Sequence, residues 1–379
     1  MRVFVSTADA SGDLHSAALV TVLRKRLAER GEPLELYGLG GEALLAAGLE
    51  PIVEQRDFAV AGLFEVASSL PRILSGMRAL KRAMKQLRPD LVLLSDSPDL
   101  NLPLARVGRK QRIPVLYYVA PQVWAWRSGR IRLLRERVTH LGVIFPFEAA
   151  LFNQAGVPAS FVGHPLVDRM TAVQQNMRPK EVAEELGIDT SRPLLALLPG
   201  SRRNEVAANL ARMRDTAQLL MQTHPGLQVR LLVAPNVEDI APEDAEILQP
   251  IRGRSHEVMA IATALLVAPG TVTIEAALLG TPMVVTHELN SLSFEIARRL
   301  TRVPSGCMVN LIADRGIVPE RIQDQARPTA LAAELSRLLR DPIARGEQRE
   351  ELAQVAARLG GPGAPERAAA LALEVAGRR

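Results

Sequence analysis

Three short segments combine glycine, hydroxyl and charged residues directly after apolar runs. They are LLPGSRRNE at 197–205, PGTVTIE at 269–275 and DSPDLN at 96–101. A strand that ends in a glycine turn and leads into a helix leaves backbone N–H groups at the positive end of the helix, where anions bind. The first two segments therefore predict a phosphate site. Taken alone, 197–205 also fits an ordinary turn with solvated arginines.

The two glycine turns of the second half carry groups that suit a nucleoside diphosphate. Backbone N–H groups, hydroxyls and a guanidinium can hold a pyrophosphate without a metal ion. Glu275, one turn further along the second segment, can accept hydrogen bonds from two ribose hydroxyls. The candidate phosphate-binding residues are Gly200, Ser201, Arg202, Gly270, Thr271 and Thr273.

Two carboxylates follow the apolar run 90–95. Asp96 comes directly after the run, and Asp99 also has a simple interpretation as the cap of a helix that begins near Leu102. Open parallel α/β sheets place their chemistry at the carboxyl ends of the strands. We therefore expect Asp96 to act as a general base on a hydroxyl that receives a group from a nucleotide diphosphate.

Neither metal nor redox chemistry is indicated by the sequence. The six histidines form no HExxH-like set, and the single cysteine, Cys307, allows neither an internal disulfide nor a cysteine metal cluster. We expect no metal and no cofactor. Among the histidines, His164 is the candidate site residue, because it lies between Gly163 and Pro165 at the end of a predicted strand.

The elements that must position these groups alternate between strand and helix. At 379 residues the chain is expected to form two domains. Apolar runs at the start of each half, 2–6 and 193–198, lead through glycine turns into helices, and the alternation continues. The pattern predicts an α/β protein with two doubly wound parallel sheets and their site-bearing edges at one cleft. We expect domains at 1–168 and 169–360, followed by a last helix in 361–379.

Composition narrows the class of partner. The net charge of +5 indicates an anionic partner, but the basic residues are spread out and no nucleic-acid module is present. No apolar run approaches the ~18 residues that span a bilayer. The N-terminus lacks a signal peptide, so we expect the protein in the cytoplasm.

One helix offers a candidate contact with lipid. The helix expected at 71–88 has an apolar face and a basic remainder, and the stretch before it, 58–70, carries a single charge. The basic side is either a solvated surface or a contact with anionic lipid. The stretch 58–70 is either core or an apolar surface beside that helix.

The same motifs, with several others in the same order along 1–325, carry a resemblance to a known family. They are SGD at 11–13, DSPDLN at 96–101, YVAPQVWAWR at 118–127, PFE at 146–148, FVGHP at 161–165, LLPGSRRNE at 197–205, GTVTIE at 270–275, PMVV at 282–285 and VNLI at 309–312. Together they resemble lipid-A-disaccharide synthase, glycosyltransferase family 19 of the GT-B superfamily. The pair APQVWAWR and LLPGSR is the most specific part of the match.

The resemblance implies a fold, a reaction and roles for individual residues. The fold is GT-B, with the last helix returning to the N-terminal domain. The reaction joins UDP-2,3-diacylglucosamine to 2,3-diacylglucosamine 1-phosphate, inverts the anomeric centre and releases UDP, at the cytoplasmic face of the inner membrane. Asp96 matches the family's proposed base, and Arg202, Glu275 and Asn310 match its nucleotide-sugar site. Other matched motifs supply further substrate-binding candidates, which are Ser11, Asp13, Asp99, Asn101, Trp124 and His164.

The chain also departs from the family pattern, and rival functions remain open. Asp9 stands where the family usually has glutamate, and Pro269 stiffens the second glycine turn. These changes bear on substrate detail more than on the class of reaction. The rivals are a UDP-GlcNAc 2-epimerase or another GT-B enzyme, and a non-catalytic sugar- or nucleotide-binding protein. The sequence does not fix the oligomeric state, and a homodimer is compatible with it.

Overall fold

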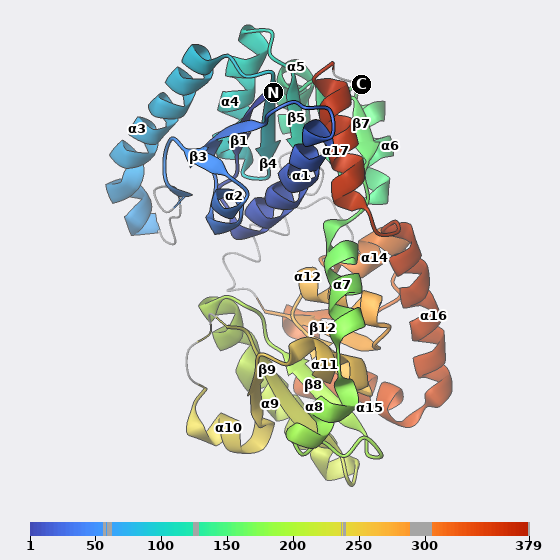
Figure 1. Ribbon diagram of the computed structural model, residues 1–379. Coiled ribbons are helices and arrows are strands. Elements are labelled where there is room, and N and C mark those ends of the chain that lie inside the picture. Colours follow the sequence, from blue (N-terminus) through green and yellow to red (C-terminus); the bar gives the residue numbers. More distant parts are fainter. Residues whose placement is uncertain are drawn as a thin grey trace. The chain divides into compact units, whose positions relative to one another are not determined.

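A computed structural model describes residues 1–55, 58, 63–123, 129–235, 237, 240–288 and 305–377, with the backbone alone for 63–70 and 204. The chain forms two compact units. The first contains Met1–Asp168 and Leu359–Arg379, and the second contains Arg169–Arg358 (Figure 1). Each unit is an α/β sandwich around its own parallel sheet. Within the described residues, no helix has the length and apolar character needed to span a bilayer.

The first unit is built on a seven-stranded parallel sheet with the order β3-β2-β1-β4-β5-β6-β7. The strands are β1 Arg2–Ser6, β2 Glu35–Leu39, β3 Leu49–Pro51, β4 Leu91–Ser95, β5 Val115–Tyr118, β6 His140–Val143 and β7 Ala159–Phe161. The helices are α1 Ala10–Ala28, α2 Glu42–Ala46, α3 Leu63–Leu87, α4 Pro98–Lys110, α5 Arg130–Arg137, α6 Pro146–Gln154 and α17 Ala364–Val375. The boundary between the units falls within α7, Pro165–Asn176.

Burial on both faces explains why these strands form a parallel sheet. All five residues of β4 are buried, and four of the five in β1 are buried. Strands that are apolar on both sides require helices on both sides, which is the arrangement of parallel sheets. Gly38 of β2 has φ 145°, and a Cβ there would lie 1.9 Å from the Val5 carbonyl oxygen, so only glycine fits between β1 and β2.

The end of the chain completes the first unit. Helix α17 lies beside α1 and contacts β5 and β6 (Figure 1). The Asp168 carboxylate accepts hydrogen bonds from the backbone N–H groups of Gly363 at 2.6 Å and Ala364 at 3.1 Å, at the positive end of α17. Arg367 on that helix donates to the Val162 carbonyl at 2.8 Å. These contacts fix the last helix to the sheet of the first unit.

The second unit is built on a six-stranded parallel sheet with the order β10-β9-β8-β11-β12-β13. The strands are β8 Leu194–Leu198, β9 Gln228–Val233, β10 Pro250–Arg252, β11 Ala264–Val267, β12 Met283–His287 and β13 Glu320–Ile322. The helices are α8 Pro179–Glu185, α9 Arg203–Thr223, α10 Pro242–Leu248, α11 Ser255–Ile261, α12 Thr271–Leu279, α14 Met308–Ala313, α15 Pro328–Arg340 and α16 Pro342–Arg358. Leucine and valine side chains from β8, β9 and β11 pack with α9 and α15 to form its core.

The predicted fold class of two doubly wound parallel sheets is confirmed. Two details of the prediction are wrong. Helix α3 begins at Leu63 and continues through Pro71, whereas proline was expected to mark its first turn. The edge strands β3, β10 and β13 were not predicted, because three residues are too few to show an apolar pattern.

Candidate active site

In the first unit, the loop with the predicted catalytic residue Asp96 and the loop that contains Asp9 follow neighbouring strands. Strand β1 pairs with β2 on one side and with β4 on the other, so the strand order reverses between β1 and β4. Asp9 lies in the loop after β1, and Asp96 comes directly after β4. Ligands of open α/β sheets bind at this reversal point, at the carboxyl ends of the strands.

Asp96 is held by its backbone, and its carboxylate is exposed to solvent. Asp96 and Ser97 both have φ 44°, the left-handed region that non-glycine residues rarely adopt. The Asp96 N–H donates to the Val119 carbonyl at 3.3 Å, and its own carbonyl accepts from the Tyr117 hydroxyl and from Asn101 Nδ2. Within the described part of the chain, the Asp96 carboxylate forms no ion pair and is exposed to solvent, and the backbone N–H of Ser97 donates a hydrogen bond to it.

The surroundings of Asp96 favour its protonated form. Desolvation by neighbouring protein atoms raises the pKa of the Asp96 carboxyl, the negative charge of Asp9 raises it further, and the backbone N–H of Ser97 opposes both. Asp9 is itself fixed as the cap of α1, since its Oδ1 accepts from the Gly12 N–H at 2.6 Å. The Ser97 hydroxyl approaches Asp9 Oδ2 at 3.5 Å. Because desolvation and the charge of Asp9 raise its pKa, the Asp96 carboxylate is a stronger proton acceptor than an ordinary aspartate.

Asn101 joins the ends of the two strands. Its Nδ2 donates to the carbonyls of Ser95 at 2.8 Å, Asp96 at 2.9 Å and Ser6 at 3.3 Å, and its Oδ1 accepts from the Ser6 hydroxyl at 2.8 Å. The residue is fully buried. The side chain predicted to bind substrate therefore has its hydrogen-bonding groups occupied by the loop that carries Asp96.

Other candidates of the first unit have structural partners. The buried Asp13 carboxylate accepts from the N–H groups of Gly41 at 2.6 Å and Ala43 at 2.9 Å, at the start of α2. Ser11 is exposed, and its hydroxyl lies 3.1 Å from His15 Nε2. Their roles in substrate binding stay predictions.

The remaining candidates of the first unit have partners of their own or lie outside the described residues. Asp99 lies in the first turn of α4, which begins at Pro98 after Ser97, so its interpretation as a helix cap is wrong, and it forms an ion pair with Arg130 of α5. His164 is buried, and its ring lies 5.2 Å from that of Phe145. Its Nδ1 accepts from the Leu166 N–H at 3.1 Å. Trp124 lies outside the described residues.

In the second unit, the two glycine turns also follow neighbouring strands. Strand β8 pairs with β9 on one side and β11 on the other, so the order again reverses between β8 and β11. The Ala268 N–H donates to the Leu198 carbonyl at 2.8 Å, which holds the turns side by side where they leave the sheet. The structure thus brings Gly200 and Gly270 to the same edge.

The first of these turns differs from the prediction of unoccupied N–H groups. Glu205 folds back over the start of α9, and its Oε2 accepts from the N–H groups of Ser201 at 3.4 Å and Arg202 at 3.3 Å. The Arg202 guanidinium, 82% exposed, donates to Glu205 Oε1 at 3.0 Å. The Glu205 carboxylate therefore occupies the position predicted for phosphate, and the expectation that these two N–H groups are unoccupied is wrong.

The second turn leaves its N–H groups unoccupied. Gly270 has φ 140°, and α12 follows it directly. The Thr273 hydroxyl is buried and donates to the Gly270 carbonyl at 2.8 Å, so it closes the turn. Over the described ranges, no partner is found for the N–H groups of Thr271 and Val272. Of the two turns, this one keeps N–H groups at the start of a helix that a phosphate could accept from, and the phosphate site stays a prediction.

Glu275 lies one turn along α12 between two basic side chains. Arg169 forms an ion pair with its Oε1, and His256 Nε2 lies 3.5 Å from its Oε2. Burial raises the pKa of the Glu275 carboxyl, but the hydrogen bonds and charges of His256 and Arg169 outweigh it and hold the pKa below its ordinary value. Neither basic partner was predicted, because nothing local in the sequence links positions 169 and 256 to 275.

Asn310 is buried and holds a loop together. Its Oδ1 accepts from the N–H groups of Ile317 at 2.9 Å and Val318 at 3.0 Å, and its Nδ2 donates to the Val318 carbonyl at 3.0 Å. The nearby Cys307 is also buried, which raises the pKa of its thiol to about 11. No three or more His, Cys, Asp or Glu residues gather as a metal site among the residues that the structure describes.

Comparison with known proteins adds a decisive observation to this geometry. The family model described as lipid-A-disaccharide synthetase matches residues 3–375, nearly the whole chain. The chain belongs to the lipid-A-disaccharide synthase family. It is a glycosyltransferase of lipid A biosynthesis, and the resemblance identified from the motifs is confirmed.

Relatives of the family match along their full length. The lipid-A-disaccharide synthase of Syntrophus aciditrophicus is 43% identical over 378 residues, which cover 98% of this chain and 97% of that protein. The lipid-A-disaccharide synthase of Geobacter metallireducens is 39% identical over 383 residues, covering 100% of this chain and 98% of that protein.

Solved structures of more distant proteins share the GT-B-like fold. The UDP-GlcNAc 2-epimerase of Neisseria meningitidis bound to UDP-GlcNAc has a TM-score of 0.63 at 13% identity, with all of both chains covered. The calicheamicin glycosyltransferase CalG4 has a TM-score of 0.61 at 17% identity, covering 100% of this chain and 98% of that one. At these identities the likeness concerns the fold alone. One of these proteins is an epimerase and the other is a glycosyltransferase, so the fold does not decide the function.

Proposed function

We propose that this glycosyltransferase joins UDP-2,3-diacylglucosamine to 2,3-diacylglucosamine 1-phosphate and releases UDP. The observation that carries the proposal is the solvent-exposed Asp96 carboxylate at the reversal point of the first sheet, which forms no ion pair among the described residues and whose pKa the charge of Asp9 raises. A carboxyl whose pKa is raised accepts a proton from an alcohol more readily, which is the requirement for a general base. The family's reaction supplies the substrates.

The proposed step is a single displacement at the anomeric carbon of the donor sugar. Asp96 takes the proton from the acceptor 6-hydroxyl, and the oxygen attacks C1 from the side opposite UDP. The bond between C1 and the β-phosphate oxygen breaks, and its electron pair leaves with UDP. The anomeric centre is inverted, and the product is the β-1,6-linked disaccharide 1-phosphate.

The second unit is proposed to hold the UDP part of the donor, with the start of α12 as the diphosphate site. The unoccupied N–H groups of Thr271 and Val272 suit a phosphate oxygen, and the helix dipole adds to the attraction. The exposed guanidinium of Arg202 can exchange Glu205 for a phosphate, since both are anions.

Glu275 is proposed to accept the ribose hydroxyls. Its depressed pKa keeps it ionised at neutral pH, and an ionised carboxylate has about four acceptor positions, of which Arg169 and His256 use two. We therefore assign the acceptor and membrane side to residues 1–168, and the UDP-sugar side to residues 169–360.

We further propose peripheral contact with lipid of the cytoplasmic leaflet of the inner membrane through residues 58–88. Part of this stretch, including 59–62, lies outside the described residues. In the described part of α3, Leu74 is 45% exposed and Leu87 is 39% exposed, among basic side chains. Exposed leucine beside lysine and arginine is typical of helices that lie on a membrane surface.

Incubation with both acylated substrates, read by mass spectrometry, tests the proposal. We expect the tetraacyl disaccharide 1-phosphate and one UDP for each product molecule. A parallel incubation with UDP-GlcNAc and no acceptor tests the epimerase alternative, and we expect no change of that sugar. Absence of disaccharide together with epimerised UDP-GlcNAc would refute the proposed function.

A further inference from the structure

Glu275 is an acidic side chain that protein atoms largely surround. Its side chain is 14% exposed, and it lies one turn along α12 from the open N–H groups of the second glycine turn. Burial by itself favours the protonated form of a carboxyl, so an ionised carboxylate at this place needs partners with hydrogen bonds or positive charge. The partners therefore determine both the charge and the orientation of Glu275.

Two partners hold the two carboxylate oxygens separately. Arg169 of α7 forms an ion pair with Oε1 of Glu275, and Nε2 of His256 on α11 lies 3.5 Å from Oε2. As the Nε2–H tautomer or as imidazolium, His256 donates toward that oxygen. The last torsion of a glutamate side chain is soft, so a carboxylate held at one oxygen can still turn. Contacts at both oxygens fix its plane.

His256 is the more effective of the two anchors. Its side chain is 27% exposed and that of Arg169 is 53% exposed, so water competes more strongly for the guanidinium. The long arginine side chain also loses more conformational freedom than a rigid imidazole when it holds a partner. Burial raises the pKa of the Glu275 carboxyl, and among the interactions that lower it again the one with His256 is the largest.

The packing of α11 sets the position of His256. Helix α11 lies against α12 (Figure 1), and its residues Val258 and Met259 are fully buried. The buried Thr281 hydroxyl, two residues beyond the end of α12, donates to the Met259 carbonyl at 2.9 Å. The backbone that carries His256 is therefore tied to the helix that carries Glu275.

The fixed carboxylate keeps acceptor positions for a ligand. An ionised carboxylate has about four such positions. Among the described residues, Arg169 and His256 take one on each oxygen, which leaves one on each oxygen. Two acceptor positions on adjacent oxygens suit two adjacent hydroxyls, such as the 2′- and 3′-hydroxyls of a ribose. A site built for a hydroxyl discriminates against the analogue that lacks it, because its own polar group then stays unpaired.

We propose that His256 is a positioning residue for the donor, which fixes the Glu275 carboxylate so that it binds both ribose hydroxyls and selects ribonucleotides over 2′-deoxyribonucleotides. The inference rests on the assignment of the ribose to Glu275 in the proposed function, to which it adds a residue and a selectivity. Its support is the pair of separate contacts that Arg169 and His256 make with the two oxygens.

Calorimetric titration of the full chain with UDP and with 2′-deoxy-UDP tests the proposal. The ratio of the two dissociation constants isolates the contact with the 2′-hydroxyl. For the wild type, UDP should bind roughly 10- to 100-fold more tightly, the range for one hydrogen bond to a charged group. Glu275→Ala should bring this ratio to about 1. His256→Ala should bring it below about a third of the wild-type value, because the carboxylate is no longer held in the binding orientation.

A conservative variant and a control separate positioning from a structural role. In His256→Gln the amide nitrogen can donate to Glu275 Oε2 in place of the imidazole, so this variant should restore at least about half of the wild-type ratio. His224→Ala is the control, since His224 is a second histidine of the same unit, at the end of α9, with its Nε2 3.1 Å from Ser336 Oγ. It should lower the melting temperature and leave the ratio unchanged.

The outcomes distinguish this inference from the proposed function. A wild-type ratio in His256→Ala would overturn the inference, and so would an equal weakening of both nucleotides, which is the result of a contact elsewhere on the nucleotide. A ratio that His256→Gln does not restore would also count against it. If Glu275→Ala loses the ratio while His256→Ala keeps it, the ribose assignment stands and only the inference fails. If Glu275→Ala keeps the ratio, both fail.

Discussion

Replacement of Asn101 by alanine tests whether this residue positions Asp96 or binds substrate. The Asn101 side chain makes four hydrogen bonds, to the carbonyls of Ser6, Ser95 and Asp96 and from the Ser6 hydroxyl. At about 1 kcal/mol for each buried bond, Asn101→Ala should lower the free energy of unfolding by roughly 3–4 kcal/mol. It should also reduce kcat, because the left-handed backbone at Asp96 loses one of its supports.

The assay is urea unfolding followed by tryptophan fluorescence. Both tryptophans, at 124 and 126, lie in the sequence of the first unit, so their signal reports on the unit that contains Asn101. A fall in the midpoint without a change in slope measures the lost stability. Steady-state turnover by the same variant, at a temperature where it is folded, gives kcat and KM.

Asn153→Ala is the matched control. Asn153 makes two hydrogen bonds with the backbone of Ala159, in the same unit but away from the loop that carries Asp96. It should cost about 1–2 kcal/mol of stability and leave kcat unchanged. If Asn101→Ala instead raised KM and left both stability and kcat at the wild-type values, Asn101 would be a substrate ligand and the positioning role would be refuted.

Three further predictions concern the charges of the two sheet edges. The Asp9 charge raises the pKa of Asp96, so Asp9→Asn should lower that pKa and move the acidic limb of the kcat/KM profile to lower pH; a limb that does not move would contradict the coupling. Glu205→Gln should strengthen UDP binding several-fold, as measured by calorimetry, because an anion leaves the start of α9, while the weaker cap costs about 0.5–1 kcal/mol. Weaker UDP binding would show that Glu205 supports the site. Glu275→Gln should weaken UDP binding roughly tenfold at neutral pH, and wild-type affinity should fall toward that of the variant as pH drops through the depressed pKa of Glu275; equal affinities throughout would remove the ribose assignment.

The turns that carry the chemistry could be predicted because their signals are local. The apolar runs before Pro199 and Asp96 are buried strands, and a short turn followed by a helix comes after each of them, as the spacing indicates. The parallel arrangement followed from apolar character on both faces of each strand. Local patterns of this kind are sufficient for the class of fold and for the edge of the sheet that carries a site.

What the sequence could not supply is the partner of each side chain. Glu205 ends the segment that was predicted to lead into a helix, and its hydrogen bonds with the preceding N–H groups depend on the exact geometry of the turn. The contact of Arg169 with Glu275 joins residues 106 positions apart, and Asn101 reaches back 95 positions to Ser6. Such contacts depend on how distant elements pack, so propensity and spacing do not show them.

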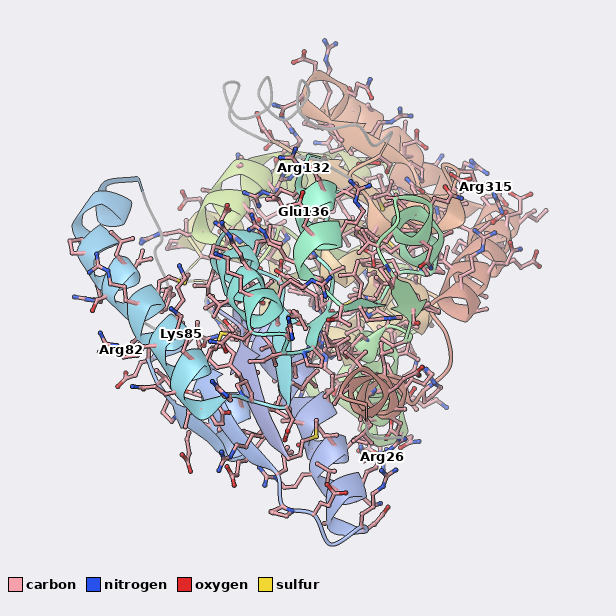
Figure 2. The ribbon with its side chains drawn as sticks, turned by 90° about the horizontal axis from the view of Figure 1, so that it is seen from above. Arg26, Arg82, Lys85, Arg132, Glu136 and Arg315 are labelled. Atoms are coloured by element: carbon pink, nitrogen blue, oxygen red, sulfur yellow. The ribbon has the colours of Figure 1, made fainter. Side chains whose placement is uncertain are left out.

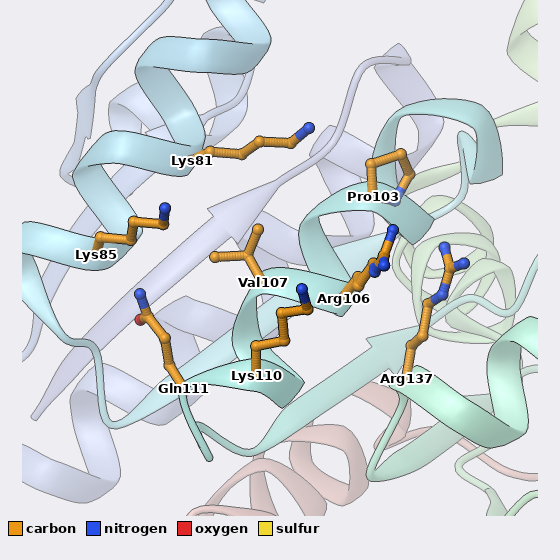
Figure 3. Close-up of a pocket in the computed structure, with 8 residues that line it drawn as sticks. All are labelled: Lys81, Lys85, Pro103, Arg106, Val107, Lys110, Gln111 and Arg137. Carbon is orange, nitrogen blue, oxygen red and sulfur yellow. The ribbon is translucent and has the colours of Figure 1, made fainter.

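The pocket between α3, α4 and α5, whose lining residues Figure 3 shows, has the same explanation. The alternation of lysine and arginine along α3 indicated a charged helix face, and the sequence left open whether that face was solvated. Only the packing of α3 and α4 on one sheet brings Lys85 and Lys110 to the same pocket.

The measurement that tests the central claim most directly is single-turnover glycosyl transfer by Asp96→Asn, with UDP affinity measured on the same sample. Glu136→Gln is its control, an exposed carboxylate on α5 of the same unit (Figure 2). Loss of a general base typically costs about 10²–10⁴ in rate. The account predicts a loss of this size in Asp96→Asn with unchanged UDP affinity and wild-type transfer by Glu136→Gln. Transfer by Asp96→Asn at the wild-type rate would contradict it.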